Sequence, residues 1–191
     1  MALTCNTINA GAAINCAVPP VAGTNNIVYL MNKDDVASIT VNSEGTVTAI
    51  SMKSTKQAYK YETGNTSVNA LYALKKSGVL NGFTHTLTIV YPANAETAIS
   101  NLSKLANSNV IGIVNQRGDD GFGTFRMLGK SQGLIAENIE GDFSNGDRDG
   151  LPFVTLATDE RFNEKSPPVH VLNTDYSTTQ TDLEALLTPA A

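Results

Sequence analysis

One stretch of the chain carries residues of the types that bind phosphate. Gly129-Lys-Ser131 matches the end of the P-loop motif, in which backbone N–H groups and a lysine hold phosphate oxygens. That motif requires a glycine five positions before Gly129, but this position is Thr124, and Gly123 is one residue too early. The intervening residues 125–128 are apolar and typical of a strand, and Gln132-Gly133 would interrupt the helix that a P-loop needs. The spacing therefore argues against a nucleotide site.

A second stretch imitates the start of a calcium-binding loop. Asn145, Asp147 and Asp149 place oxygen ligands at the first, third and fifth positions, and Gly150 occupies the sixth. The bidentate glutamate expected at the twelfth position is replaced by Leu156, inside an apolar run. The sequence favours a polar β-turn, with a weak calcium site as the alternative.

The sequence shows no recognisable arrangement of catalytic residues. The adjacent carboxylates Asp119-Asp120 and Asp159-Glu160 are typical of solvated loops, and no nucleophile elbow or oxyanion hole accompanies them. The two histidines, His85 and His170, are far apart, and His85 fits a half-buried position in a strand. We therefore predict no catalytic, cofactor-binding or metal-binding residue and no cofactor, and we expect the protein not to be an enzyme.

Composition and charge exclude further classes of protein. The net charge of −5 and the absence of tryptophan argue against a basic nucleic-acid surface and against an aromatic platform for bases or sugars. No stretch approaches the roughly 20 apolar residues of a membrane helix. The N-terminus lacks the features of a signal peptide, which predicts synthesis into the cytoplasm. Cys5 and Cys16 either close a small disulfide loop or remain reduced, and the second alternative is favoured.

The elements that would position these residues are mostly strands. Residues 27–31, IVYLM, form a continuous apolar run that predicts a strand buried on both faces. Alternation predicts strands over residues 36–41 and 47–52, joined by a hairpin turn, and over residues 83–91. Residues 53–62 are interpreted as a continuation of strand.

The C-terminal half reads as strands separated by glycine-rich or acidic turns. Its apolar segments are residues 110–114, 123–128, 133–143 and 151–156. Because the connections are short and polar, they leave no room for crossover helices, and a sequential antiparallel meander over residues 110–171 is predicted.

The hydrophobic period changes only once over a long segment. Residues 94–106 place apolar side chains at helical spacing, with Asn94 as the N-cap. The fold class is therefore mainly β, a β-sandwich or barrel of about ten strands with one flanking α-helix near 94–106. We expect an extended N-terminal arm over 1–25, a single domain over 26–172, and a polar C-terminal tail over 173–191 with a weak helical segment at 181–187.

The order of features in the C-terminal half is similar to that of a known family. A helix is followed by the strand at 110–114, the glycine-punctuated stretch 123–134, GDRDGLPFVTL at 146–156, and an acidic, proline-containing segment at 164–168. This order resembles the C-terminal half of major tail (tail tube) proteins of tailed bacteriophages, especially those of Bacteroidetes phages and prophages. The start of the chain, with Cys5, Cys16 and residues 27–36, also resembles the opening of such proteins.

The resemblance implies a structural protein of the virion tail. Such proteins close as hexameric rings, and the rings stack into a tube through which DNA passes without specific binding. The implied partners are other copies of the chain and other tail or connector proteins, with no membrane and no cofactor. Assembly would take place in the cytoplasm of the bacterial host.

Other roles remain as alternatives to the tube. Within viruses these are a tail terminator, a head–tail connector or a capsid decoration protein, and outside them a ligand-binding β-barrel. For the tube itself, the polar residues 54–66 are predicted to form a projecting hairpin that contacts the next ring.

Overall fold

A computed structural model describes residues 22–62, 68–76, 81–92, 96–117 and 124–190. Cys5, Cys16 and Asp119-Asp120, together with most of the predicted N-terminal arm, lie outside these residues. The described part forms strands β1 (Thr24–Asn32), β2 (Val36–Val41), β3 (Val47–Met52), β4 (Tyr59–Glu62), β5 (Val68–Lys75), β6 (Gly82–Val90), β7 (Val110–Gln116), β8 (Thr124–Leu128), β9 (Ile135–Glu140), β10 (Phe153–Ala157) and β11 (Val169–Val171), with helices α1 (Glu96–Leu105) and α2 (Tyr176–Ala185).

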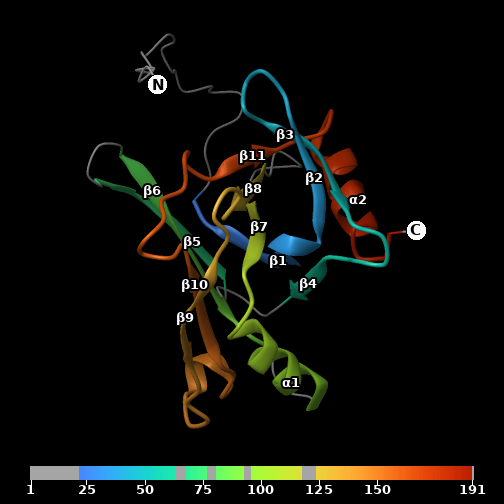
Figure 1. The fold of residues 1–191 in the computed structure, drawn as a ribbon. Helices are drawn as coiled ribbons and strands as arrows, with labels where there is room; N and C mark the ends of the chain where they lie inside the picture. Colours follow the sequence, from blue (N-terminus) through green and yellow to red (C-terminus); the bar gives the residue numbers. More distant parts are fainter. Residues whose placement is uncertain (1–21, 63–67, 77–80, 93–95, 118–123, 191) are drawn as a thin grey trace.

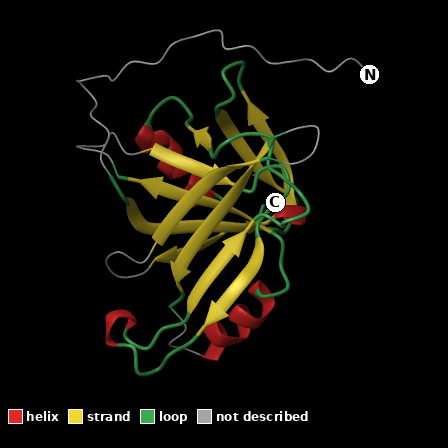
Figure 2. Ribbon diagram, turned by 90° about the vertical axis from the view of Figure 1, so that its left-hand side faces the viewer, coloured by secondary structure: helices red, strands yellow, loops and turns green. Residues whose placement is uncertain are grey.

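These strands form two sheets packed face to face (Figures 1 and 2). The larger has seven strands in the order β2-β3-β11-β8-β7-β1-β4, and the smaller has four in the order β5-β6-β10-β9. The mainly β prediction is confirmed, and the predicted helix near 94–106 is present as α1.

The predicted meander over residues 110–171 is corrected by the strand pairing. β7 and β8 do form an antiparallel pair, but β9 and β10 pair in the four-stranded sheet, and β11 returns to β8 in the seven-stranded sheet. The chain thus crosses between the sheets after β8 and again after β10. Short connections excluded crossover helices, as expected, but they did not keep all of these strands in one sheet.

The first hydrophobic core lies between the two sheets. β1 and β7 contribute Val28, Leu30 and Val114 from one side, and β6 and β10 contribute side chains such as Leu87 and Leu156 from the other. The sheets approach so closely here that a Cβ atom on Gly112 would lie 2.7 Å from Leu87 Cδ2, which explains a glycine within this buried strand.

A second core covers the opposite face of the seven-stranded sheet. Tyr29 and Met31 of β1 and Ile113 of β7 point to this side, where they meet Leu183 of α2. The centre of the seven-stranded sheet is therefore buried on both faces, which confirms the prediction for residues 27–31. Figure 1 shows α2 beside β2 and β3, on the side away from the four-stranded sheet.

The polar tail predicted over residues 173–191 is corrected by α2. Asp175 caps this helix by accepting a hydrogen bond from the Thr178 N–H at 2.7 Å. The Tyr176 ring stacks on Phe125 with ring centroids 5.1 Å apart, and the Tyr29 hydroxyl donates to Glu184 at 2.7 Å. Residues 173–190 are thus an integral part of the domain.

The described part of the predicted projecting hairpin is docked on the domain. The N–H of Thr55 donates to the Ala190 carbonyl, and the N–H of Ala58 donates to that of Leu186, both at 2.8 Å. Residues 59–62 then form β4, which pairs with β1 in the seven-stranded sheet. Residues 54–62 therefore do not project, and residues 63–66 lie outside the described part.

Candidate assembly surfaces

The edge strand β5 of the four-stranded sheet is long, apolar and exposed. Its first seven residues, 68–74, carry no charge and include no proline. Leu71, Tyr72 and Leu74 have 55%, 59% and 57% of their surface exposed. An edge strand of this kind presents unpaired backbone groups to other chains, and proteins that stay monomeric usually protect such an edge with charges, proline or a bulge.

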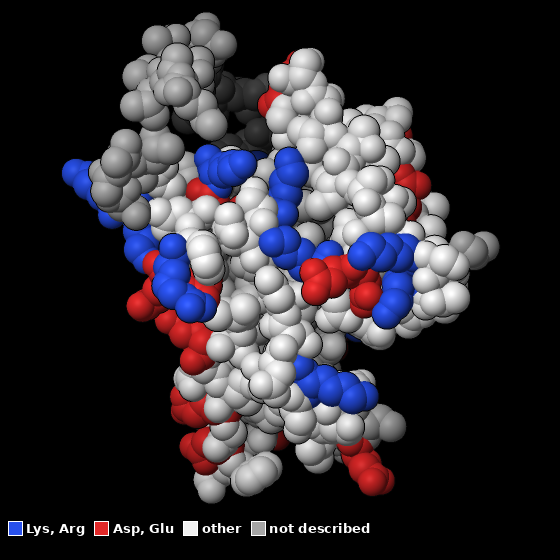
Figure 3. Space-filling model, viewed as in Figure 1, with Lys and Arg blue, Asp and Glu red and all other residues white. Residues whose placement is uncertain are grey.

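The opposite edge of the same sheet, β9, has a different character. Glu137 and Glu140 are exposed on this strand, and Asp142 follows it. In Figure 3, red side chains follow the lower left margin of the molecule over β9 and the loop after it. The two free edges of one sheet are therefore chemically unlike, one uncharged and apolar and the other acidic.

A cleft of about 760 Å³ runs beside β5, between it and the seven-stranded sheet. Arg117 and Arg126 are the charged side chains among the described residues that line it, and Tyr72, Pro167 and Leu128 are among the apolar ones. The surface next to the β5 edge is thus positive, whereas the β9 edge is negative.

Strand directions allow the two edges to join. β5, β6, β10 and β9 are antiparallel to their neighbours in that order, so β5 and β9 run in opposite directions. If β9 of one copy lies beside β5 of another and both copies keep the same orientation, the alternation continues without a break. Head-to-tail contact of this type closes rings when the rotation permits.

The outer face of the four-stranded sheet is rich in hydroxyl groups. Thr84, Thr86 and Thr88 alternate along β6 with the buried His85, Leu87 and Ile89. Thr155 of β10 lies directly beside Thr88 on the same face. Leu71 of β5 and Ala157 of β10 pair with Thr86, so the centre of this face is uncharged and mixes hydroxyl groups with apolar side chains.

The glycine-rich loop that imitated a phosphate site does bind an anion, one that belongs to the chain itself. The N–H of Ser131 lies 2.9 Å from Glu164 Oε2, and the N–H of Gln132 lies 2.6 Å from Oε1. Glu164 is almost completely buried. Its carboxylate occupies the position that a phosphate would need, so these N–H groups serve the fold.

His85 holds the same loop from the other side. Its Nδ1 accepts a hydrogen bond from the Gly129 N–H at 3.1 Å, and Nε2 lies 3.0 Å from the Ser166 carbonyl oxygen. These partners require a neutral ring protonated at Nε2. Burial lowers the pKa of His85, against a smaller opposing effect of Glu164. His85 is fully buried, where the sequence predicted a half-buried position.

The loop that imitated a calcium site is closed by its own hydrogen bonds. Asn145 Oδ1 accepts from the Asp147 N–H at 3.0 Å, and Asp142 Oδ1 accepts from the Ser144 N–H at 2.9 Å. Two of the expected ligand positions, Asn145 and Asp147, are therefore tied into a turn. Among the described residues, no group of three or more His, Cys, Asp or Glu side chains is arranged to hold a metal ion.

The remaining polar residues singled out by the sequence lie apart. Arg161 binds Asp159 at 2.6 Å and lowers the pKa of this carboxyl to about 2, while Glu160 is exposed. His170 lies on β11, where burial, followed by the nearby Arg126, lowers its pKa. The structure brings His85 and Glu164 to one loop and leaves Asp159, Glu160 and His170 outside it.

Comparisons with known proteins add no relative: no family model, curated protein or solved structure matches this chain. Within the described residues, no helix has the length and apolar character required to cross a membrane.

The predictions from sequence do not include residues 68–75 as a candidate assembly surface. A usable signal was present, because residues 68–74 carry no charge although the chain is charged on both sides of them. The role of Glu164 had no local signal, since its partners are 32 and 33 residues away. The segment of α2 did carry a helical apolar pattern, with Tyr176, Leu183 and Leu187 on one side.

Proposed function

We propose that this chain is a structural protein that assembles head to tail into stacked rings, as the tail tube of a tailed bacteriophage. The observation that carries the proposal is that the two free edges of the four-stranded sheet could pair between copies. The β5 edge is uncharged and exposed, the β9 edge is acidic, and the two strands run in opposite directions. Because the edges differ, a copy joins through its β5 to the β9 of the next copy, and the contact repeats around a ring.

The face of the four-stranded sheet suits the inner wall of such a ring. Joined edge to edge, the four-stranded sheets of several copies form a continuous barrel with the threonine-rich face exposed on one side. If that face lines the channel, Thr84, Thr86, Thr88 and Thr155 meet the DNA. The centre of this face offers phosphates no cations to bind, and DNA slides along it.

The sequence resemblance to tail tube proteins supports the virion role, with the bacterial cytoplasm as the place of assembly and other tail or connector proteins as further partners. The hexamer is the ring size that the family implies. A terminator, connector or decoration protein would use the same edge contact but would stop at one ring. A ligand-binding barrel is less well supported, because the cleft of about 760 Å³ opens beside an edge strand and is lined by two arginines.

The proposal is tested by placing a charge on the β5 edge. Leu71→Lys changes a side chain that is 55% exposed, so folding is preserved while edge pairing is opposed. Negative-stain microscopy of the purified wild-type protein is expected to show rings or tubes, and the variant is expected to remain monomeric. Ile99→Lys on α1, with 57% exposure, is the matched control and assembles like wild type.

The result that contradicts the proposal is equally concrete. A wild-type protein that stays a featureless monomer at high concentration is not a tube protein. Tubes of indefinite length favour the tail tube, whereas single closed rings favour the terminator. If Leu71→Lys and Ile99→Lys assemble equally well, β5 is not the contact edge.

A further inference from the structure

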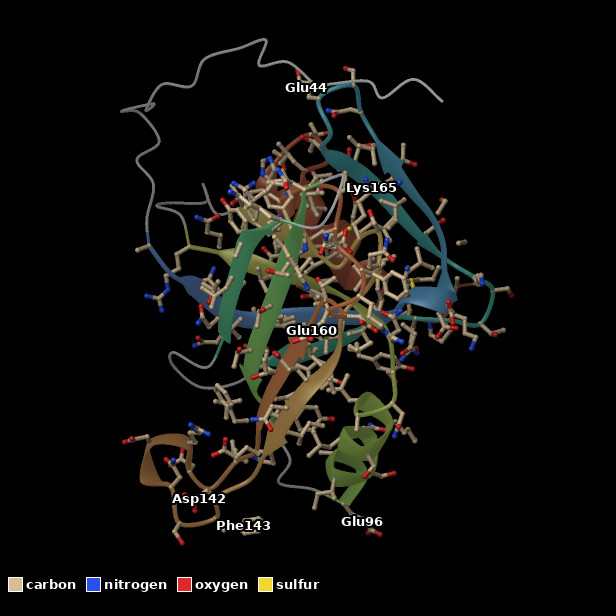
Figure 4. All side chains as sticks on the ribbon, turned by 60° about the vertical axis from the view of Figure 1, so that its left-hand side comes forward. Glu44, Glu96, Asp142, Phe143, Glu160 and Lys165 are labelled. Atoms are coloured by element: carbon tan, nitrogen blue, oxygen red, sulfur yellow. The ribbon has the colours of Figure 1, made fainter. Side chains whose placement is uncertain are left out.

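The loop after β9 presents the most exposed large hydrophobic side chain in the described part of the molecule. Phe143 is 92% exposed. The loop that carries it is tightly organised, because the N–H of Gly150 donates to the Asn145 carbonyl at 3.0 Å and Arg148 lies 4.3 Å from the centre of the Phe153 ring. Figure 4 shows Asp142 and Phe143 together at the far end of the β9–β10 hairpin. An exposed aromatic side chain on an ordered loop is typical of an interface anchor.

Acidic residues surround this phenylalanine. Asp142, Asp147 and Asp149 are exposed in the same loop, and Glu140 ends the preceding strand. Arg148 is the single basic residue between 140 and 152. The four carboxylates and one guanidinium give residues 140–152 a net charge of −4 + 1 = −3. We call residues 140–152 the acidic knob.

The cleft beside β5 has complementary properties. Its described lining carries two positive charges, Arg117 and Arg126, and no negative one. Its apolar walls include Tyr72, Pro167 and Pro168. A volume of about 760 Å³ exceeds that of a single aromatic side chain, so Phe143 and part of its loop can enter.

Strand register brings the knob and the cleft to the same end of the sheet. Val68 pairs with Ile89, and the next residue of β6, Val90, pairs with Phe153 of β10. Phe153 pairs with Glu140 on its other side, so Val68 and Glu140 lie at one end. When β9 of one copy continues the sheet at β5 of another, the Glu140 end arrives beside the Val68 end, where the cleft begins.

We propose that the acidic knob of one copy, led by Phe143, docks in the arginine-lined cleft of a second copy of the chain. The inference rests on the proposed head-to-tail assembly and specifies one contact between neighbouring copies. Phe143 packs on the apolar walls, while the carboxylates of Glu140 and Asp142 pair with Arg117 and Arg126. The contact adds a directional element to the pairing of two strand edges, and its charges favour the head-to-tail arrangement over the head-to-head one.

The test exploits the opposite charges of the two surfaces. One variant carries Arg117→Glu and Arg126→Glu, and the other carries Glu140→Lys and Asp142→Lys. Each variant alone brings like charges together and is expected to need about tenfold more protein to assemble. Mixed in equal amounts, each cleft meets a knob of opposite charge, and assembly returns to within about threefold of wild type by sedimentation velocity. Thermal unfolding of each separate variant verifies that the fold is intact.

A cross-linking experiment detects the contact even when assemblies are short. In a background with Cys5→Ser and Cys16→Ser, the variants Phe143→Cys and Pro167→Cys are mixed and oxidised. A disulfide-linked heterodimer is expected, whereas Phe143→Cys mixed with Ile99→Cys gives none.

The outcomes separate the inference from the proposed function. If wild type forms rings but both charge-reversed variants assemble normally, or if the two cysteine mixtures cross-link equally, the knob-in-cleft contact is overturned and the edge contact stands. If the specific cross-link forms while wild type makes only pairs or open chains, the contact stands and the tube does not. A wild-type monomer without the specific cross-link overturns both.

Discussion

The carboxylate of Glu164 accepts the backbone N–H of Ser131, at 2.9 Å from Oε2 and 3.1 Å from Oε1. This contact ties the segment before β11 to the loop between β8 and β9, the point at which the chain passes from one sheet to the other. The loop thus resembles a phosphate-binding turn for a physical reason. It exposes N–H groups to an anion, and the anion is supplied by the fold.

Glu164→Gln is expected to lower the free energy of unfolding by roughly 1.5–3 kcal/mol, the range for a hydrogen bond to a charged group. The glutamine amide keeps one oxygen as an acceptor. Its NH2 group replaces the second carboxylate oxygen and faces a backbone N–H, which is also a donor. Urea denaturation monitored by circular dichroism measures the loss. Glu160→Gln, four residues earlier and exposed, is the matched control and changes stability by about 0.5 kcal/mol or less. Equal values for the two variants would contradict the role of Glu164.

The sequence predicted the interior of the fold better than its connections. Residues 27–31 and 110–114 are continuous apolar runs, and both lie in strands buried on two faces, because burial on two faces removes the alternation that one-sided strands show. Residues 94–106 carry their own helical period. These features are local patterns, so they can be recognised in the sequence without knowing which elements pack against them.

The sequence alone did not indicate which sheet each strand joins or which strands lie at the edges of a sheet. The crossing after β8 depends on Glu164 and His85, which lie far away in the sequence. The position of β5 at an edge depends on which strands pair, and a run such as ALYAL is equally compatible with a buried strand. The candidate assembly surfaces are therefore properties of topology, with only the missing charge over residues 68–74 as a local sign.

Acidification below pH 6.5 is expected to destabilise the protein. The pKa of His85 in the folded state lies below its ordinary value of 6.5, so the unfolded chain binds this proton first as the pH falls. The stabilising contribution is complete above pH 6.5 and is lost as the pH falls through the folded pKa. The carboxyl groups with shifted pKa values, such as Asp35 and Glu184, have them lowered and act at more acidic pH.

Urea unfolding at pH 7.0 and 5.5 measures this effect. Because burial lowers the pKa of His170 as well, the measurement is repeated with His170→Gln, which leaves His85 as the remaining histidine. A decrease in stability that persists in this variant is assigned to His85. A flat response between the two pH values would show that His85 titrates normally in the folded protein.

Gly133→Ala is expected to lower the free energy of unfolding by more than the strain of placing alanine in the left-handed region. Gly133 has φ of +81°, and an added Cβ atom would overlap Asn109, whose side chain donates to the Gln132 carbonyl. The backbone conformation alone costs about 1–2 kcal/mol. Gly45→Ala separates the two effects, because Gly45 has φ of +87° with nothing within 4 Å of the added atom. The difference between the two variants in chemical denaturation measures the clash, and equal losses would rule it out.

Leu183→Ala tests whether α2 belongs to the folded unit. Leu183 is almost fully buried against the seven-stranded sheet, in the core that includes Tyr29 and Phe125. Its truncation leaves a cavity and is expected to cost about 2–5 kcal/mol in the free energy of unfolding. Leu74→Ala makes the same chemical change at an exposed position and is expected to cost about 1 kcal/mol or less. Both are measured in urea at a concentration where the wild-type protein is monomeric, since Leu74 lies on the proposed contact edge. A small loss for Leu183→Ala would mean that α2 adds little to the stability of the sheet, and the C-terminal segment could then be exchanged without disturbing the strands that carry the proposed assembly.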